Sequence, residues 1–356
     1  MGEERSKLDI EYPPHVHIGL GKNELMLKTF LMMCIIAFAS VIVMGLEALI
    51  HILLAIGTVL IVHSSIYSYQ LWKGIEPTYK SPASPLVAGM IVGLAMPIAA
   101  PFEVTVGVAL LTILVFKYGQ GRYFKRKYLN PAAISKVLLL VLLSVMVFLE
   151  DPLDTGMLFH THHYDWFIIE FGSLAEAAGF KEAVEFFSRD SISILGIYTV
   201  EVELTPAQGL FLWQTHGWIG GASSLVVLIV GAISAYWLRY KWRIIVSTLV
   251  TMTVLAAGTG LYLGGDPILR IAFHVFTGSV IFLIFFMATE PQSTPLTENS
   301  QYVFGISLAV LTFALQLLNV LGGSIIALVI LNMATPYLDK IGIKTPYGHK
   351  GSKGGA

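Results

Sequence analysis

The sequence predicts an all-α polytopic membrane protein, and three observations indicate this class. Hydrophobic residues make up 55% of the 356 residues and charged residues 13%, whereas charged residues make up about 25% of a typical soluble domain. The mean hydropathy of the chain is +0.74. Apolar runs near 20 residues recur along the chain, and a helix of about 20 residues crosses a hydrocarbon core of about 30 Å. These runs lack the alternating pattern of a transmembrane β-barrel.

The apolar runs predict about ten spans, five on each side of a polar interval. We expect the spans at 27–45, 47–69, 86–96, 103–118, 131–149, 217–238, 244–263, 268–288, 302–318 and 324–338. The third and fourth spans are short for a full crossing, and Pro97 and Pro101 stop the third because proline breaks a helix. Helix ends are therefore expected inside the membrane. Pro131 is well placed as the first residue of its span.

The chain divides into five parts: a tail at 1–25, a five-helix half at 26–150, the polar interval at 151–216, a second five-helix half at 217–338 and a tail at 339–356. Because each half has an odd number of spans, a repeated half would be inverted in the membrane. Transporters built from such repeats bind their substrates between broken or short helices. The sequence similarity between the halves is weak, so the prediction of two inverted five-helix repeats depends on the order of the spans.

The distribution of charge predicts the orientation. With the N-terminus inside, the inner side collects the basic runs at 117–127 and 239–243 and the basic residues of both tails. The outer connectors carry Arg270, and the polar interval has ten acids against Lys181 and Arg189. This is the asymmetry of the positive-inside rule. We therefore expect a multi-pass protein of the inner or plasma membrane, with both tails in the cytoplasm and 151–216 outside it.

Composition also bears on partners and metals. The net charge of −1 indicates no nucleic-acid partner. The single cysteine, Cys34, leaves no disulfide framework and no thiolate metal cluster. We expect no metal site, because the histidine-rich stretch at 160–165 is more typical of a solvated loop than of a metal centre.

Four stretches of the sequence resemble the signatures of one family. They read PHVH at 14–17, SPLVAGMIVGLAMP at 84–97, GQGRYFKRKYLNPA at 119–132, and MATEPQSTP at 287–295 followed by FGI at 304–306. In order, they are similar to "PHI", "S-A-L-V-T-G-L-L-L-A-L-x-L-P", "G-G-x-G-x-N-x-F-N-P-A" and "M-x-T-D-P-x-[ST]-[ST]-P … FG". These signatures belong to the RnfD/NqrB family, the membrane subunit shared by Rnf complexes and the sodium-pumping NADH:quinone oxidoreductase.

The resemblance spans nearly the whole chain and implies both a fold and a function. It implies two inverted five-helix repeats similar to the urea-channel architecture. It also implies electron transfer through flavin, coupled to Na+ or H+ movement, with other subunits of an Rnf/Nqr-type complex as partners. The chain has no nucleotide-binding loop and no cysteine cluster of its own. We therefore assign no catalytic residue and do not expect this chain to oxidise NADH or ferredoxin alone.

The resemblance also implies a covalent FMN on Thr205. The family attaches FMN by a phosphoester to the threonine of an S-G-A-T motif before the sixth span, and here that place reads VELTP at 202–206. A second motif, "G-E-T-S-x-L", reads GGASSL at 220–225 and lacks the acid. Residues 205–208, TPAQ, also have the pattern of a helix capping box, which would use the same hydroxyl. The alternative function is a non-redox channel or transporter, or a structural paralogue, on the same scaffold that has lost covalent FMN.

Candidate ion-pathway residues lie where the eighth span ends. Thr289 and Glu290 stand there beside a proline-broken segment, and Asn130 of the Asn-Pro-Ala stretch completes the set. Ionisable groups at membrane depth are costly and usually functional. The alternative for Glu290 is an interfacial acid that ends a helix before a turn.

Other polar residues within the apolar runs have simpler expected roles. His51, His63 and His274 are expected to bond to neighbouring hydroxyls or carbonyls rather than to bind haem. Lys136, one turn into its span, is expected to extend its ammonium group to the inner interface, as long basic side chains do near helix ends.

Overall fold

The computed structural model describes residues 21–120, 129–150, 177–215, 217–238, 240–263, 266–277, 280–318, 320 and 322–341. For residues 142–150, 177–179 and 182 it describes the backbone alone. The predictions for most of the N-terminal tail, the basic residues at 122–127, the stretch at 160–165 and the end of the C-terminal tail lie outside the described residues.

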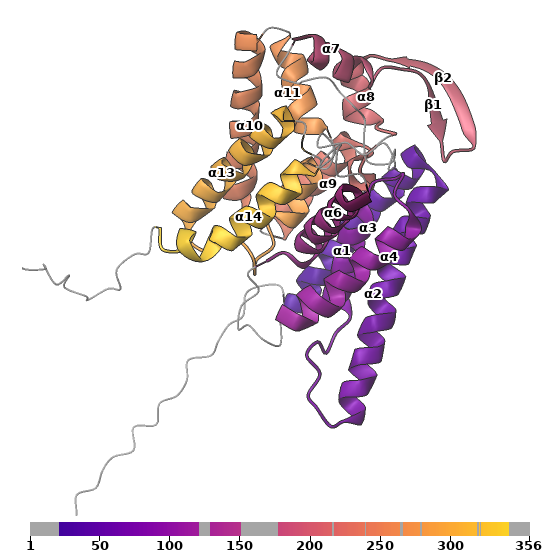
Figure 1. The fold of residues 1–356 in the computed structure, drawn as a ribbon, viewed down its shortest axis with the longest axis vertical. Helices are drawn as coiled ribbons and strands as arrows, with labels where there is room; N and C mark the ends of the chain where they lie inside the picture. Colours follow the sequence, from indigo (N-terminus) through magenta and orange to yellow (C-terminus); the bar gives the residue numbers. More distant parts are fainter. Residues whose placement is uncertain are drawn as a thin grey trace, which may run out of the picture.

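Helices dominate the described chain, as predicted for a polytopic membrane protein (Figure 1). The first half contains α1 (Lys22–Met44), α2 (Leu46–Trp72), α3 (Ala83–Leu94), α4 (Phe102–Leu111), the π-helix η1 (Thr112–Gly119) and α6 (Pro131–Glu150). The interval contains α7 (Ala177–Glu185), β1 (Arg189–Ile194), β2 (Tyr198–Leu204) and α8 (Pro206–Leu212). The second half contains the 3-10 helix η3 (Ile219–Gly221), α9 (Ser224–Trp237), α10 (Trp242–Leu263), α11 (Pro267–Phe276), α12 (Val280–Phe282), the π-helix η4 (Leu283–Met287), α13 (Glu298–Leu317) and α14 (Gly323–Leu338).

Five helical segments in the described chain are long and apolar enough to cross a membrane: α1, α2, α4 with η1, α10 and α13. A sixth span results if α11 and the α12–η4 segment are counted together, although the chain bends by 60° between them. Shorter apolar helices, α3, α6, α9 and α14, stand at the positions of the other predicted spans. The protein is therefore a multi-pass helical membrane protein, and its ten-span arrangement stays a prediction.

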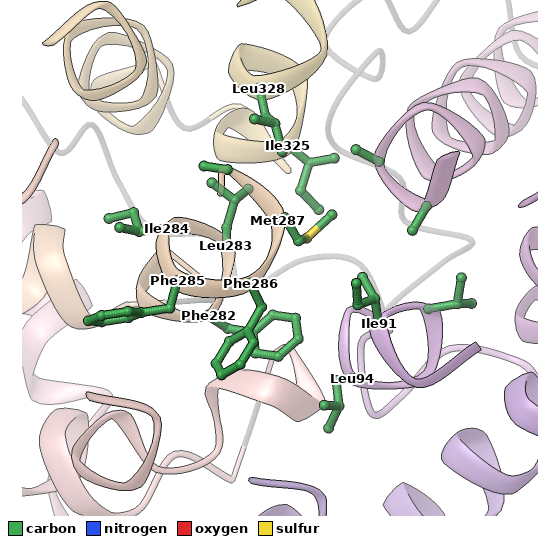
Figure 2. Packing of buried hydrophobic residues seen from close by; sticks show 14 of the residues in the cluster. Ile91, Leu94, Phe282, Leu283, Ile284, Phe285, Phe286, Met287, Ile325 and Leu328 are labelled. Carbon is green, nitrogen blue, oxygen red and sulfur yellow. The ribbon is translucent and has the colours of Figure 1, made fainter. Parts of the chain in front are cut away.

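Exposed apolar side chains on the outer helices fit a lipid-facing surface. Leu31 and Phe38 on α1, and Leu53 and Ile61 on α2, are all more than half exposed. Large apolar side chains exposed in such number along long helices are typical of a lipid-facing surface. Apolar side chains in the centre of the molecule are instead buried, including all six residues from Phe282 to Met287. Figure 2 shows this central segment between Ile325 and Leu328 of α14 and Ile91 and Leu94 of α3.

Small residues bring α3 close to α2. A Cβ atom on Gly93 would lie 2.8 Å from the Cα of Ile52, and one on Gly89 would lie 3.0 Å from the Cα of Ile56. Glycine at such positions permits the close helix packing common in membrane proteins.

The chain between α3 and α4 is irregular and joins the two halves of the molecule. Helix α3 ends at Leu94, three residues before Pro97. The Ile98 N–H donates to the Gly217 carbonyl (2.9 Å), and the Ile219 N–H donates to the Met96 carbonyl (2.9 Å). Buried backbone groups must find such partners, and here they find them in the segment that precedes α9. Helix α3 thus ends inside the helix bundle, and the position of this end in the membrane stays a prediction.

The polar interval contains a β-hairpin that the all-α prediction omitted. Strands β1 and β2 pair antiparallel, with Ile192 opposite Val200 and Ile194 opposite Tyr198. Alternating β-branched residues explain the strands. The three-residue turn between them, 195–197, has positive φ at Leu195 (57°) and Gly196 (71°), the backbone conformation of a type I′ turn.

The hairpin reaches across to the N-terminal helices (Figure 1). At its tip, the Leu195 N–H donates to the Ile42 carbonyl near the end of α1 (2.8 Å). Gly45, between α1 and α2, has a φ of 80°, and a Cβ atom there would lie 3.3 Å from the Leu195 carbonyl oxygen. The turn between α1 and α2 therefore requires glycine both for its backbone conformation and for the contact with the hairpin.

Candidate functional site

Asn130 links the beginning of α6 to the end of η4. Its side-chain oxygen accepts hydrogen bonds from the N–H groups of Ala132 (3.1 Å) and Ala133 (3.2 Å). Asparagine is a favoured helix N-cap for this reason, and Pro131 fits the first helical position. The Asn130 amide nitrogen donates to the Met287 carbonyl (3.3 Å), and the residue is only 2% exposed. One buried side chain thus begins a helix of the first half and binds the backbone of the second.

Thr289 and Glu290 follow η4 in a compact turn. Thr289 is buried, and its hydroxyl donates to the Phe285 carbonyl (2.5 Å). Glu290 is half-buried, and its carboxylate accepts a hydrogen bond from the Ser293 hydroxyl (3.1 Å). The Thr294 hydroxyl donates to the Glu290 carbonyl (2.5 Å). The structure therefore brings the three candidate ion-pathway residues to one place, since Asn130 bonds to Met287, two residues before Thr289.

Helix α14 also contacts the turn that contains Thr289 and Glu290. The Thr335 hydroxyl donates to the Ser293 carbonyl (3.0 Å). With its amide oriented to satisfy both neighbours, Asn332 donates to the same carbonyl (3.1 Å) and accepts from the Asn130 N–H (3.1 Å). Both residues are buried, so α6, α14 and the turn after η4 are held together by polar groups with satisfied hydrogen bonds.

A lysine holds the far end of the turn. The Lys241 ammonium group donates to the Thr294 carbonyl (2.9 Å) and hydroxyl (2.6 Å) and to the Pro291 carbonyl (3.4 Å). The short segment therefore contains the negative charge of Glu290 and is hydrogen-bonded to the positive charge of Lys241. This turn, defined as residues 287–294, is called the η4 turn below.

Aromatic hydroxyls continue the polar cluster toward α2. The Tyr79 hydroxyl donates to the Lys117 carbonyl (3.1 Å). Burial, and next the negative charge of Glu290, raise the pKa of Tyr79 to about 12. The Tyr79 and Tyr118 rings meet edge to face, with centroids 5.1 Å apart, and the Tyr118 hydroxyl shares a hydrogen bond of 2.7 Å with His63 Nδ1. Polar groups thus extend from Glu290 to His63 through two tyrosines.

The sequence interpretation missed Tyr79, Tyr118 and Lys117 in this cluster. Tyr79 lies in a proline-broken loop, and Lys117 and Tyr118 lie at the end of an apolar run where charge usually marks a boundary. The one available signal was that Lys117 and Tyr118 stand at the end of the short predicted span 103–118, so a helix would carry them. Their placement depends on η1, whose π-helical turns commonly mark functional segments.

The oxygen atoms at the η4 turn are of the types that bind hard cations such as alkali ions. Alkali and alkaline-earth ions bind carboxylate, hydroxyl and carbonyl oxygens, and Glu290, Ser293, Thr289 and Thr294 supply such atoms. In the described part of the chain, no three or more histidine, cysteine, aspartate or glutamate residues gather as candidate metal ligands. Among the described residues, the turn thus combines one carboxylate, that of Glu290, with the ammonium group of Lys241.

Thr205 occupies a different part of the molecule, as the N-cap of α8. Its hydroxyl accepts a hydrogen bond from the Gln208 N–H (3.4 Å), and the Gln208 side-chain oxygen accepts one from the Thr205 N–H (3.0 Å). The predicted capping box is confirmed. Thr205 is exposed. Its hydroxyl is therefore accessible for forming a phosphoester once the hydrogen bond from the Gln208 N–H is released. The residues that replace Ser-Gly-Ala belong to β2, where Glu203 is also exposed.

The η4 turn and the hairpin that leads to Thr205 lie near opposite ends of α1. Thr29, near the beginning of α1, hydrogen-bonds to Tyr240 (2.8 Å), which precedes the Lys241 that binds the η4 turn. Ile42, near the end of α1, binds the hairpin that leads to Thr205. A helix rises about 1.5 Å per residue, so the candidate ion residues and the hairpin tip lie at opposite ends of this helix.

The histidines inside the bundle bond to neighbouring side chains, as predicted. His51 shares a hydrogen bond of 2.7 Å with Thr105, and His274 shares one of 3.1 Å with Gln316. His274 also lies beneath α7, where Phe180 stacks against its ring with centroids 6.4 Å apart. Arg270, expected in an outer connector, is fully buried, and its guanidinium lies 4.1 Å from the centroid of Phe180. Helix α7 thus covers both residues.

The prediction for Lys136 is wrong. Lys136 is 4% exposed, and its ammonium group donates to the Ala95 carbonyl just after α3. It also lies 3.1 Å from the ring centroid of Trp218. The side chain turns inward because the end of α3 offers a carbonyl and an aromatic face inside the bundle, close to α6.

These features define a class of protein: a multi-pass helical membrane protein whose broken helices bring polar residues together inside the bundle. The chain belongs to the NQR2, RnfD, RnfE family, whose sequence profile matches residues 9–348.

Relatives from several organisms are similar to this chain. An ion-translocating oxidoreductase complex subunit of Actinobacillus succinogenes is 23% identical over 341 residues, which cover 92% of this chain and 94% of that protein. A proton-translocating ferredoxin:NAD(+) oxidoreductase complex subunit of Clostridium ljungdahlii is 24% identical over 349 residues, covering 95% and 96%. A Na(+)-translocating NADH-quinone reductase subunit of Azotobacter vinelandii is 31% identical over 135 residues, covering 36% and 33%.

Proposed function

We propose that this chain is the membrane subunit of an ion-translocating oxidoreductase complex of the Rnf/Nqr type, and that it works with other subunits of that complex in the bilayer. The supporting observation is its similarity to two complex subunits, over 94% and 96% of their lengths, whose names describe ion or proton translocation. The transported ion is Na+ or H+, since relatives of both descriptions match.

The proposed architecture has ten spans in two inverted five-helix repeats. Both tails lie in the cytoplasm, and the interval 151–216 lies outside it. The short apolar helices α3, α6, α9 and α14 supply the four spans beyond the six long or bent ones. The hairpin and Thr205 then face the outer side, and the η4 turn faces the inner side.

The proposed redox role uses a flavin, FMN, attached to the Thr205 hydroxyl. The flavin would supply the electron transfer, and the protein would supply its position and surroundings. The accessible hydroxyl at the N-cap supports this role. Formation of the phosphoester would release the cap hydrogen bond to Gln208, which is long at 3.4 Å.

The test is in-gel fluorescence of the chain produced together with its flavin-attaching enzyme. A covalent flavin survives denaturation, so the wild-type band should fluoresce under ultraviolet light and a Thr205→Val band should be dark. Thr312→Val serves as the matched control, because Thr312 is buried in α13, and its band should stay fluorescent. A dark wild-type band would support the non-redox paralogue instead.

The proposed ion path enters at the η4 turn. Asn130 and Thr289 hold its backbone, and Glu290 supplies the charge that attracts the cation. The convergence of Asn130 from one segment with Thr289 and Glu290 from another supports this assignment.

A further inference from the structure

The C-terminal end of α3 lies inside the bundle and presents backbone carbonyl groups there. The last carbonyl groups of a helix have no N–H donors within the helix, and they carry the negative end of the helix dipole. Helix α3 ends at Leu94, inside the bundle, and Leu94 faces the central segment in Figure 2. The next carbonyl, that of Ala95, points to a side chain of another helix.

That side chain is Lys136 of α6. Its ammonium group donates to the Ala95 carbonyl and lies 3.1 Å from the centroid of the Trp218 ring. A carbonyl oxygen and an indole face are two groups that bind ammonium ions, the first by hydrogen bonding and the second through its π-system. Among the described residues, no ion pair includes Lys136.

Segments from both halves of the molecule form this place. Ala95 and Lys136 belong to the first half, and Trp218 belongs to the segment before α9. Trp218 is fixed there by its bridge to Pro97 and by the flanking hydrogen bonds of Ile98 and Ile219. The indole face and the carbonyl are therefore held by the backbone, independently of the lysine.

We propose that the Ala95 carbonyl and the Trp218 ring form a site for a small monovalent ammonium ion, and that the chain fills this site with its own Lys136. A buried charge without a carboxylate partner is costly, whereas a methionine would fill similar space without charge. In this proposal the carbonyl oxygen and the indole face, which both bind ammonium ions, offset this cost. The site is separate from the η4 turn and from Thr205, and it stands whether or not the chain carries a flavin.

The test removes the tethered ion and supplies a free one. The full-length Lys136→Ala chain is purified in detergent, and its thermal midpoint is measured with increasing methylammonium chloride. Methylammonium should raise the midpoint of Lys136→Ala by roughly 2–4 °C relative to its effect on the wild type, with saturation. Methanol, a neutral molecule of similar size, should have no such effect.

Lys73→Ala is the matched control. Lys73 also stacks on a tryptophan, with its ammonium group 4.8 Å from the Trp72 ring centroid, but both residues are exposed. Methylammonium should not stabilise this variant more than the wild type. Equal responses of Lys136→Ala and Lys73→Ala, or an equal effect of methanol, would overturn the proposal.

A double-mutant cycle keeps the proposal testable if Lys136→Ala does not fold. Trp218→Leu should lower the midpoint less in the Lys136→Met background than in the wild type, because the cation that the indole binds is already absent. Additive shifts of the two substitutions would show that the ring does not bind the charge, and the site would be rejected.

Discussion

Glu290 carries the charge of the η4 turn, where it accepts a hydrogen bond from Ser293 and lies half-buried. A Glu290→Gln variant keeps the size of the side chain and removes its charge. A contact to a charged group contributes about 1.5–3 kcal/mol, which corresponds to roughly tenfold or more in rate. We therefore expect ion transport by the complete complex in membrane vesicles to fall about tenfold or more.

The control for this variant is Glu298→Gln. Glu298 forms an exposed ion pair with Arg243 (2.7 Å), a type of contact worth about 0–1 kcal/mol. It should leave ion transport near the wild-type rate. Equal transport by Glu290→Gln and the wild type would remove Glu290 from the path.

Asn130 should contribute to stability through two kinds of bond. Asn130→Ala loses the N-cap of α6, worth about 1 kcal/mol, and leaves the Met287 carbonyl without this donor, which costs about 1–3 kcal/mol. Asn130→Ser keeps a cap acceptor and loses the amide donor to Met287. We expect the thermal midpoint to fall most for Asn130→Ala and less for Asn130→Ser.

Asn299→Ala provides the comparison for the asparagine variants. Asn299 is exposed in the first turn of α13, and exposed substitutions usually change stability by less than about 0.5 kcal/mol. If Asn130→Ala melts at the same temperature as Asn299→Ala, the link between α6 and η4 has no energetic importance.

At the scale of the element, the contact of α3 with α2 depends on glycine. Alanine in place of glycine usually stabilises a helix by about 0.5–1 kcal/mol. At Gly93, however, the added Cβ atom would lie 2.8 Å from the Cα of Ile52, and overpacking costs about 1–3 kcal/mol. Gly93→Ala should therefore lower the thermal midpoint of the purified chain.

Gly107 of α4 gives the opposite expectation, because no atom lies within 4 Å of a Cβ built there. Gly107→Ala should leave the midpoint unchanged or raise it slightly. A common response of both variants would mean that helix propensity, rather than the contact with Ile52, decides the outcome at Gly93.

Local signals made several elements predictable. Pro97 indicated the early end of α3, Pro131 the beginning of α6, and residues 205–208 the cap of α8, because each acts through its own backbone or its near neighbours. The family motifs also placed Asn130, Thr289 and Glu290 in one candidate set, and the structure brings them together.

The remaining features depend on distant partners. Lys136 turns inward because of Ala95 and Trp218, which are 41 and 82 positions away in the sequence. The hairpin at 189–204 lay in an interval judged by polarity alone, although its alternating Ile, Val and Tyr residues have the pattern of strands. The π-helical turns η1 and η4 have no signal in residue type that separates them from α-helix.

At the scale of the whole molecule, orientation is the property that connects the sites with the function. In a Cys34→Ser background, a cysteine at Glu201 should react with a membrane-impermeant maleimide in intact cells. A cysteine at Lys340 should react only after the membrane is opened. Both positions are accessible to solvent, so their reactivities report the side of the membrane, and the reverse pattern would invert the proposed topology.

The β-hairpin gives this molecule a tether outside its apolar core. Its base continues into α7 and α8 beside α11, and its tip is bound to the end of α1 by one backbone hydrogen bond. Any sliding of one group of helices past the other would have to carry this arm along or release its tip. The opposite end of α1 is also bound across the molecule, by the hydrogen bond between Thr29 and Tyr240 (2.8 Å). Helix α1 is therefore tied near both of its ends, so in the proposed transport cycle it would move together with the hairpin tip and the Tyr240 segment, or one of these bonds would have to break.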